Sequence, residues 1–279
     1  MIESPSQVLR RHGLSARKTW GQHFLRDHAV HGAIVGAAAP RPEDRVVEIG
    51  AGLGTLTAHL LGTGAEVWAI ERDRDLCEVL RAELGEQPRF RLHEADAVRF
   101  DYASAASDLG ERRPIIVGNL PYHLTGPLMF RLLEAHAVTG PWVVMIQREV
   151  ADRLRAAPGS RTYGGITAAL SRVRDISGVM HVPPGAFLPP PRVDSAVIRL
   201  DPRPSPRGEV SDERGYLALV RVAFQRRRKT LLNALSALAP KEQVRAWCAA
   251  AEVDPRLRPE CLGPEQFAAL QRAREAERA

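Results

Sequence analysis

A stretch of four residues carries an amide, a carbonyl that faces a proline, and an aromatic ring. Its members are Asn119, Leu120, Pro121 and Tyr122. They follow an apolar run over residues 114–118, which predicts a buried strand that ends there. Ligands bind at the carboxyl ends of strands in open α/β sheets, so these groups could hold a planar amino-purine and accept hydrogen bonds from its exocyclic amine. Asn and Pro also form turns, and a plain strand-ending turn is the alternative.

A glycine-rich turn follows an earlier predicted strand over residues 45–49. Gly50, Gly52 and Gly54 alternate with other residues, and Glu48 precedes them. Glycines let the backbone approach a ligand closely and take dihedral angles that other residues avoid. The dinucleotide fingerprint places its third glycine one position later. The spacing found here therefore points away from a pyrophosphate and towards S-adenosylmethionine, a cation, although the glycines could also form only a tight connection.

Two acidic residues end the next two predicted strands. Glu71 closes the strand over residues 66–70 and lies where an acid can accept hydrogen bonds from both ribose hydroxyls. Asp96 lies just beyond the strand over residues 89–92, where a carboxylate can accept the adenine amine. Either acid alone would be read as a solvated loop charge. Together with the glycine turn and Asn119, they form a row of polar groups along one edge of the predicted sheet, which indicates a site.

The elements that must position this row alternate between strand and helix. Strands are predicted over residues 45–49, 66–70, 89–92, 114–118 and 142–146, with helices between them and antiparallel strands over 175–182 and 193–200. A proline-rich linker over 201–208 precedes helical patterns only. We therefore predict an α/β fold with a Rossmann-like parallel sheet and a small all-helical C-terminal domain. The predicted parts are a basic N-terminal arm (1–26, partly mobile, with one short helix), a domain over 27–201 that contains the row of polar groups, and a helical domain over 202–279.

The charge of the chain is unevenly distributed. The 279 residues include 39 Lys and Arg against 33 Asp and Glu, for a net charge of +6 and a pI near 9.7. Residues 1–26 hold five basic residues and one acidic residue, and residues 202–279 hold 15 basic and 10 acidic residues, which leaves the middle slightly acidic. Basic ends suggest that a polyanion contacts the periphery. A general preference for arginine in the genome is the alternative.

The composition excludes several classes of protein. A hydrophobic content of 44% supports an ordinary core. No apolar run approaches the roughly 20 residues that cross a bilayer, and the N-terminus has no signal-peptide pattern, so we expect a cytoplasmic protein without a membrane partner. Three scattered cysteines indicate reduced thiols rather than disulfides or zinc ligands. We find no metal-ligating cluster and no Ser-His-Asp arrangement.

Six segments resemble the rRNA adenine N6-dimethyltransferase family, in order and with the family's spacing over residues 17–235. They are GQHFL (21–25), EIGAGLG (48–54), NLPY (119–122), QREVADRL (147–154), PPGAFLPPPRVDS (183–195) and AFQRRRKT (223–230). The last two resemble the small-subunit (KsgA) branch, and the Erm branch, which acts on large-subunit rRNA, is the nearer alternative. His23 departs from the family pattern, which has asparagine at that place.

The resemblance implies dimethylation of the N6 amine of two adjacent adenosines in the 3′-terminal stem-loop of small-subunit (16S) rRNA. It further implies S-adenosylmethionine as cofactor, a substrate within a pre-30S particle during ribosome biogenesis, and a monomeric enzyme. Two rival hypotheses stay open. One is a non-catalytic ribosome-assembly or RNA-binding factor, against which the intact Asn-Leu-Pro-Tyr stretch argues. The other is a methyltransferase for small molecules or proteins, for which the basic ends would be dispensable.

The glycine turn and the resemblance together nominate three groups of residues. The cofactor group is His23, Leu25, Glu48, Gly50, Gly52, Glu71, Asp96 and Asn119. The catalytic group is Asn119, Leu120, Pro121 and Tyr122, with Phe187 as the wall against the second face of the base. The RNA-binding group is Arg10, Arg11, Arg17, Lys18, Arg226, Arg227, Arg228 and Lys229. A solvated helix face is the alternative for residues 226–229.

Overall fold

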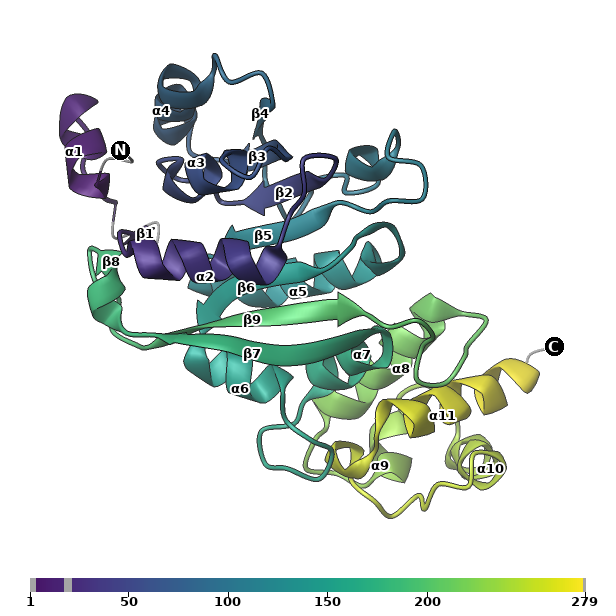
Figure 1. Ribbon diagram of the computed structural model, residues 1–279. Coiled ribbons are helices and arrows are strands. Elements are labelled where there is room, and N and C mark those ends of the chain that lie inside the picture. Colours follow the sequence, from purple (N-terminus) through teal and green to yellow (C-terminus); the bar gives the residue numbers. More distant parts are fainter. Residues whose placement is uncertain (1–3, 18–21, 278–279) are drawn as a thin grey trace. The chain divides into compact units, whose positions relative to one another are not determined.

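A seven-stranded sheet forms the centre of the first of two units in this computed structural model, which describes residues 4–17 and 22–277 (Figure 1). The strand order is β4-β3-β2-β5-β6-β9-β7. The strands are β2 (Arg45–Ile49), β3 (Glu66–Glu71), β4 (Phe90–Glu94), β5 (Ile115–Asn119), β6 (Trp142–Gln147), β7 (Arg174–Val182) and β9 (Ser195–Pro202). Strands β2 to β6 pair in parallel and β9 is antiparallel to β6. The predicted α/β fold is confirmed.

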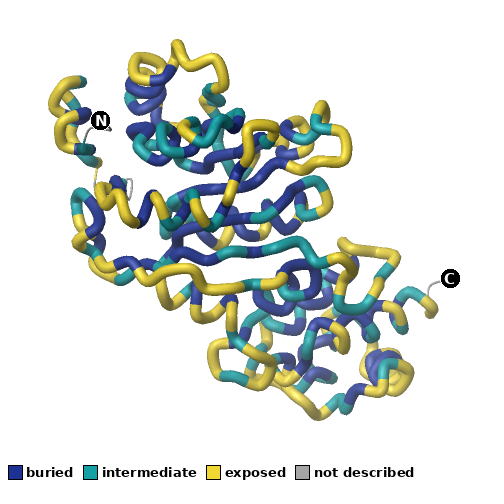
Figure 2. Tube along the Cα trace, viewed as in Figure 1, coloured by how far each residue is buried: buried dark blue, intermediate teal, exposed yellow. Residues whose placement is uncertain are grey.

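The central strands are buried because their sequences are apolar on both faces. Val46 and Val47 in β2 have no exposed surface, and Figure 2 shows the central strands as the dark-blue interior of this unit. Such continuous apolar runs are typical of parallel strands covered on both sides. Arg45 at the start of β2 is also buried, and it pairs with Glu66 and Asp108 at 2.7 and 2.5 Å. A buried guanidinium is thereby neutralised at the end of the sheet opposite the strand ends that carry the predicted site.

Helices cover the sheet, and two of them begin at side chains that cap them. They are α2 (His28–Ala38), α3 (Thr55–Leu61), α4 (Arg74–Leu84), α5 (Thr125–Glu134) and α6 (Arg148–Leu154). Asp27 accepts the N–H groups of Ala29 and Val30 at the start of α2, and Asp73 accepts the N–H of Asp75 at the start of α4. Helices α2 and α3 contact each other, and α2 packs against β6 while α3 packs against β3.

The sheet reverses its order of connection between β2 and β5. Ile49 pairs with Gly118, so the ends of these two strands lie side by side. A Cβ atom at Gly118 would lie 2.6 Å from the Ile49 carbonyl oxygen, a distance that no side chain tolerates. This reversal is the place where ligands bind in open α/β sheets.

Two short strands join segments that are far apart in the sequence. β1 (Phe24–Leu25) pairs with β8 (Phe187–Leu188), and no sequence pattern indicated either strand. The helix α1 (Pro5–Arg11) confirms the predicted short helix of the arm. Its Val8 and Leu9 are buried in a cluster with Phe24. The arm is therefore packed on the first unit, which comprises residues 1–151 and 177–202, over the part of the arm that the structure describes.

The second unit is helical and comprises residues 152–176 and 203–279. It contains α7 (Gly165–Val173), α8 (Glu213–Gln225), α9 (Leu231–Leu235), α10 (Lys241–Ala250) and α11 (Pro264–Ala276). Contacts divide the chain after residue 202, where the sequence predicts a boundary, and they group residues 152–176 with the helices and not with the sheet. Tyr163 and Ala168 belong to the core of the helical unit, with Tyr216 and Phe267.

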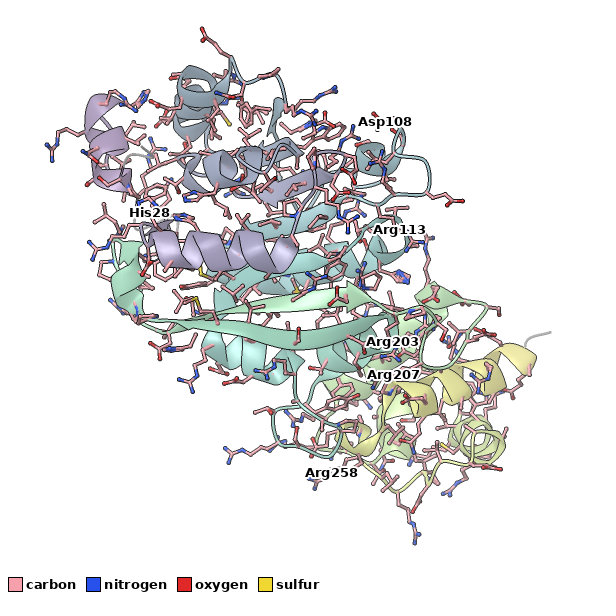
Figure 3. All side chains as sticks on the ribbon, in the orientation of Figure 1. His28, Asp108, Arg113, Arg203, Arg207 and Arg258 are labelled. Atoms are coloured by element: carbon pink, nitrogen blue, oxygen red, sulfur yellow. The ribbon has the colours of Figure 1, made fainter. Side chains whose placement is uncertain are left out.

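Ion pairs accompany this helical core. Asp175 pairs with Arg203 and lies 3.7 Å from Arg207, and both arginines are labelled in Figure 3. The buried guanidinium of Arg172 pairs with Glu213 and lies over the ring of Tyr216 at 4.6 Å from its centroid. Within the described residues, no helix is both long and apolar enough to cross a membrane.

Candidate active site

A cavity of about 160 Å³ opens at the carboxyl ends of β2, β3 and β5, within the first unit. It brings together every residue nominated for the cofactor and the whole Asn-Leu-Pro-Tyr stretch. Its walls include His23, Leu25, Glu48, Gly50, Gly52, Glu71, Asp96, Asn119, Leu120, Pro121 and Tyr122. The row of polar strand ends predicted from the sequence is therefore the lining of one cavity.

The glycine turn forms the floor between β2 and α3. Gly50, Gly52 and Gly54 have φ angles of +73°, +59° and +78°, which are left-handed values that favour glycine. A Cβ atom at Gly54 would also lie 2.9 Å from a methyl group of Leu84 on α4. The spacing of the glycines is thus required by the backbone itself, and Gly50 and Gly52 line the cavity without a side chain.

Glu71 holds the turn from the neighbouring strand. One carboxylate oxygen accepts the N–H of Gly52 at 3.0 Å, and the other accepts the N–H groups of Arg72 and Asp73 at 2.8 and 2.9 Å. Burial nevertheless raises the pKa of Glu71, because these three hydrogen bonds only partly offset the loss of water. A buried carboxylate with fixed orientation at this place can accept further hydrogen bonds from ligand hydroxyls.

Glu48 lies beneath the turn and is fully buried. Burial raises its pKa to about 8; the hydroxyl of Thr57, which donates to the carboxyl at 2.6 Å, opposes the rise, and the nearby charge of Glu71 adds to it. The pKa of this carboxyl group therefore lies close to neutral pH, so the group ionises readily when a cation comes near.

Asp96 lies beyond β4 and is partly exposed in the cavity wall. One carboxylate oxygen accepts the N–H of Val98 at 2.9 Å, which fixes the side chain in a turn. Gln22 and Asp73 join the cavity wall through a hydrogen bond of 2.8 Å, and neither was nominated from the sequence.

Asn119 ends β5 with its amide directed across the cavity wall. Its Nδ2 donates to the carbonyl oxygen of His23 at 3.1 Å, which orients the amide and leaves Oδ1 as the acceptor. Leu120 is buried and its N–H donates to the carbonyl of Met145 at 3.0 Å. Pro121 follows with no N–H of its own. Two oxygens, the Asn119 Oδ1 and the Leu120 carbonyl, are thus presented by a stretch that both neighbouring contacts hold in place.

Tyr122 is held at its hydroxyl and leaves its ring at the cavity. The hydroxyl shares a 2.6 Å hydrogen bond with Ser195, a fully buried residue at the start of β9. The His23 ring lies nearly parallel to the Tyr122 ring, at an angle of 23° with centroids 5.9 Å apart. His23 Nδ1 in turn donates to the carbonyl of Pro189 at 2.7 Å. The imidazole that replaces the family's asparagine therefore faces the aromatic wall.

Phe187 lies elsewhere than the sequence analysis expected. It is 1% exposed, does not line the cavity, and packs in the main hydrophobic core with Leu25 and Val182. Its position follows from the pairing of Leu25 with Phe187 between β1 and β8, which turns the ring inward. In this structure the ring that faces Tyr122 is His23, so a role of Phe187 against the base has no support from the geometry.

The nominated basic residues of the arm are exposed and are partly engaged within the chain. Arg10 is exposed; Arg11 pairs with Glu83 at 2.7 Å, and Arg17 pairs with Asp75. Lys18 lies outside the residues that the structure describes. RNA would have to compete with these acids for two of the three described arginines.

The basic run of the helical unit forms a turn between α8 and α9 and does not lie on a helix face. The Lys229 N–H donates to the carbonyl of Arg226 at 2.8 Å, which closes the turn. Arg226, Arg228 and Lys229 are exposed. Arg227 is half-buried and donates to Glu260 at 2.6 Å, so its role in the described structure is internal.

Two further features were missed from the sequence. Ser195 is the last residue of a family segment, and no local pattern in the sequence indicates that it holds Tyr122. His28, His31 and His59 lie close together beside the cavity, and the only local signal was the spacing of the first two on one helix. Burial, with His59 and His28 nearby, lowers the pKa of His31 to about 4.

Comparison with known proteins gives consistent results. The family model for ribosomal RNA adenine dimethylase matches residues 13–271. The ribosomal RNA small subunit methyltransferase A of Anaeromyxobacter sp. (strain K) is 49% identical over 278 residues, covering 96% of this chain and 97% of that protein. A dimethyladenosine transferase from Plasmodium falciparum superposes with a TM-score of 0.71 at 26% identity, over 89% of this chain and 96% of that one. The 23S rRNA methyltransferase ErmE gives a TM-score of 0.65 at 26% identity, over 90% and 98%.

Proposed function

The chain belongs to the ribosomal RNA adenine dimethylase family, a family of methyltransferases, and from that premise we propose that it dimethylates the N6 amine of two adjacent adenosines in the 3′-terminal stem-loop of small-subunit rRNA. One observation carries the proposal. The Asn-Leu-Pro-Tyr stretch and the glycine turn, with Glu71 and Asp96, line the same cavity. A donor of methyl groups and an acceptor amine can therefore meet there.

S-adenosylmethionine fits the lining of this cavity. Gly50 and Gly52 line the cavity without a side chain, Glu71 offers a fixed carboxylate for hydroxyls, and Asp96 offers one for an amine. The half-exposed His23 and the buried Leu25 complete the wall. When bound, the cofactor supplies a methyl group activated by its sulfonium charge.

The chain's own contribution is to hold the adenine amine. The lone pair of N6 is delocalised into the purine ring, so the amine is a weak nucleophile. Hydrogen bonds from the amine to Asn119 Oδ1 and to the Leu120 carbonyl would make the nitrogen pyramidal and direct its lone pair towards the methyl group. No general base is required, because the amine becomes cationic when it gains the methyl group and then releases a proton to water. The gain in rate comes from position and electrostatics.

The aromatic wall holds the base itself. Stacking on the Tyr122 ring would stabilise an extruded adenine by about 1–3 kcal/mol. The hydrogen bond of Tyr122 to Ser195 fixes the ring before the base arrives, so little conformational entropy is lost on binding. The second methylation needs only one of the two acceptors, because the monomethylated amine has a single hydrogen left.

The RNA is held through phosphates, in our proposal, by Arg10, Arg11, Arg17 and Lys18 and by residues 226–229. Exposure of Arg226, Arg228 and Lys229 supports this for the helical unit. Affinity for a small-subunit rRNA fragment should fall steeply between about 50 and 200 mM salt, and an Arg226→Gln, Arg228→Gln double variant should show a shallower slope. A flat response of the unchanged protein would contradict phosphate contacts.

We also propose that the substrate is the rRNA of a pre-30S particle and that the chain acts as a monomer. Every residue nominated for the cofactor and the amine comes from the first unit of one chain, which supports a monomer.

Mass spectrometry of rRNA tests the function. The protein and labelled cofactor are incubated with unmethylated small-subunit particles, with naked small-subunit rRNA and with large-subunit rRNA. We expect two adjacent N6,N6-dimethyladenosines in the small-subunit particle only. Labelling of large-subunit rRNA instead would favour the activity named for ErmE, and no labelling of any RNA would favour a non-catalytic factor.

A further inference from the structure

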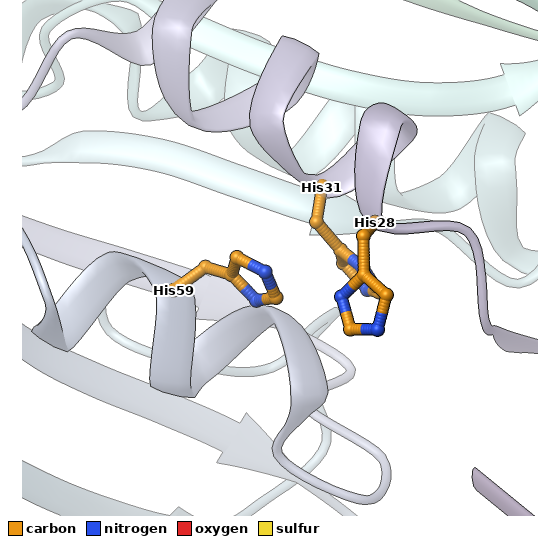
Figure 4. Close-up of side chains that lie close together, drawn as sticks. All are labelled: His28, His31 and His59. Atoms are coloured by element: carbon orange, nitrogen blue, oxygen red, sulfur yellow. The ribbon is translucent and has the colours of Figure 1, made fainter. Parts of the chain in front are cut away.

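Three imidazoles gather between α2 and α3, to one side of the cofactor cavity. His28 and His31 lie one turn apart on α2, on the same face of the helix, and His59 faces them from α3 (Figure 4). One ring nitrogen of each lies within 4.8 Å of one ring nitrogen of the other two. The ring centroids of His31 and His59 are 4.7 Å apart, and those of His28 and His59 are 5.6 Å apart.

His31 is the residue that requires an explanation. It is 1% exposed, and among the described residues neither of its ring nitrogens has a hydrogen-bond partner. A buried polar group without a partner costs about 1–3 kcal/mol, so native proteins nearly always supply one. The rings of His59 and His28 lie beside the His31 ring, and both are imidazoles as well.

His59 is oriented as metal-binding histidines commonly are. Its Nδ1 lies 2.8 Å from the carbonyl oxygen of Thr55. A carbonyl can only accept, so Nδ1 carries the proton and the lone pair lies on Nε2. A backbone carbonyl that holds the second nitrogen in this way fixes both the tautomer and the ring orientation of a ligand.

We propose that His28, His31 and His59 form a binding site for a divalent transition metal, with Zn²⁺ as the preferred ion. Three imidazoles suit Zn²⁺, Co²⁺, Ni²⁺ and Cu²⁺, whereas Mg²⁺ and Ca²⁺ prefer oxygen. Tetrahedral Zn²⁺ with bonds of about 2.0–2.1 Å places its ligand nitrogens about 3.4 Å apart. Rotation of the exposed His28 and the half-exposed His59 towards His31 closes the distance. Solvent reaches the cluster at His28, which is exposed near the start of α2 (Figures 3 and 4), and water supplies the fourth ligand.

The ion would join the two segments that flank the glycine turn and both line the cofactor cavity. α2 follows residues 22–25 after a short turn, and α3 begins directly after Gly54. His31 itself lines the cavity. The site therefore has a structural role, in which the metal fixes the glycine turn relative to the segment that carries His23, and it takes no part in the methyl transfer.

Calorimetric titration of tag-free, chelator-treated protein with ZnCl₂ tests the proposal. We expect one Zn²⁺ per chain with a Kd below about 1 µM. His28→Ala and His59→Gln should each weaken binding by at least about tenfold, since each removes one of three ligands. His181→Ala is the matched control, because His181 is also a half-exposed histidine but pairs with Asp194 on another part of the unit. It should bind Zn²⁺ as the unchanged protein does.

Two further measurements do not depend on calorimetry. Co²⁺ bound in place of Zn²⁺ should give the visible absorption of a four-coordinate site, and Zn²⁺ should raise the Tm of the unchanged protein but not of His28→Ala. The absence of binding at about 100 µM Zn²⁺, far above the expected Kd of about 1 µM, would overturn the proposal. Binding that survives in both His28→Ala and His59→Gln would also overturn it. The first result would assign water to His31 instead.

Discussion

The two halves of the cavity are built in different ways. In the cofactor half, the glycine turn is held by Glu71, 19 positions from Gly52, and Glu71 is held by the next two residues. In the amine half, Asn119 is oriented by His23, 96 positions away, and Tyr122 by Ser195, 73 positions away. The first half is a local structure, and the second exists only when distant segments have come together.

The two halves of the cavity also offer different chemical groups. The cofactor half offers carboxylates and backbone groups. Burial raises the pKa of one of its acids, Glu48, to about 8. The amine half offers neutral oxygens and an aromatic ring. A substitution in the cofactor half should therefore act mainly on cofactor binding, and a substitution in the amine half should act mainly on methyl transfer.

The largest effect is expected for Asn119→Ala. Loss of the Asn119 Oδ1 removes one of two acceptors for the amine, and methyl transfer should fall by at least about 10²–10³-fold, as when one donor of an oxyanion hole is removed. Affinity for S-adenosylmethionine should stay within several-fold. Tritium incorporation into small-subunit rRNA measures the first and calorimetry the second. Incorporation near the rate of the unchanged protein would contradict the role of Asn119 as an acceptor for the amine.

Glu71→Ala should show the opposite pattern. Hydrogen bonds to a charged group contribute about 1.5–3 kcal/mol, so the affinity for S-adenosylmethionine should fall by about 10- to 100-fold. Calorimetric titration with the cofactor measures it. Glu83→Ala is the control, because Glu83 is an acid that pairs with Arg11 away from the cavity lining. Equal affinities of both variants would show that Glu71 is not a cofactor ligand.

The buried Glu48 predicts a dependence of stability on pH. Its pKa is raised from 4.5 to about 8 in the folded protein. Between these values the folded protein keeps a proton that the unfolded chain has released, so the free energy of unfolding should fall as the pH rises, by at most about 1.4 kcal/mol per pH unit for one proton.

Glu48→Gln isolates this contribution, because a glutamine does not ionise. Urea unfolding of both proteins at several pH values measures it. The difference in stability between them should change steadily from pH 4.5 to about 8 and then stay constant. If the free energies of unfolding of the two proteins differ by the same amount at every pH from 4.5 to about 8, Glu48 is ionised in the folded protein.

The smallest effect is expected for Tyr122→Phe. The ring stays and only the hydrogen bond to Ser195 is lost, which is worth about 0.5–1.5 kcal/mol, so methyl transfer should fall by no more than about tenfold. Tyr122→Ala also removes the stacking surface and should fall further. Steady-state methylation rates compare the two. A greater loss in Tyr122→Phe than in Tyr122→Ala would assign the hydroxyl, and not the ring, to the reaction.

The same division explains what the sequence could predict. The glycine turn, Glu71 and Asp96 were recognised because each follows its own strand, and the parallel sheet brings strand ends together. The confirmed α/β fold rests on equally local patterns. The burial of Phe187 could not be predicted in this way, since it depends on a pairing of two-residue strands, β1 and β8, that no period reveals.

Packing between distant segments accounts for the other differences. Residues 152–176 join the helical unit because Tyr163 and Ala168 complete its core, a fact of side-chain packing that the linker over 201–208 did not reveal. The three histidines came together because α2 contacts α3, and His59 alone gave no pattern.

The contact between His23 and Pro189 has a consequence for biosynthesis. The two residues are 166 positions apart, so His23 leaves the ribosome long before the segment that holds its ring has been made. The glycine turn and its Glu71 can form on the nascent chain as soon as the first strands pair. The wall that faces Tyr122 must wait until β8 and β9 have emerged. An enzyme whose family modifies ribosomal RNA thus completes its own substrate wall only when the ribosome has translated most of its first unit.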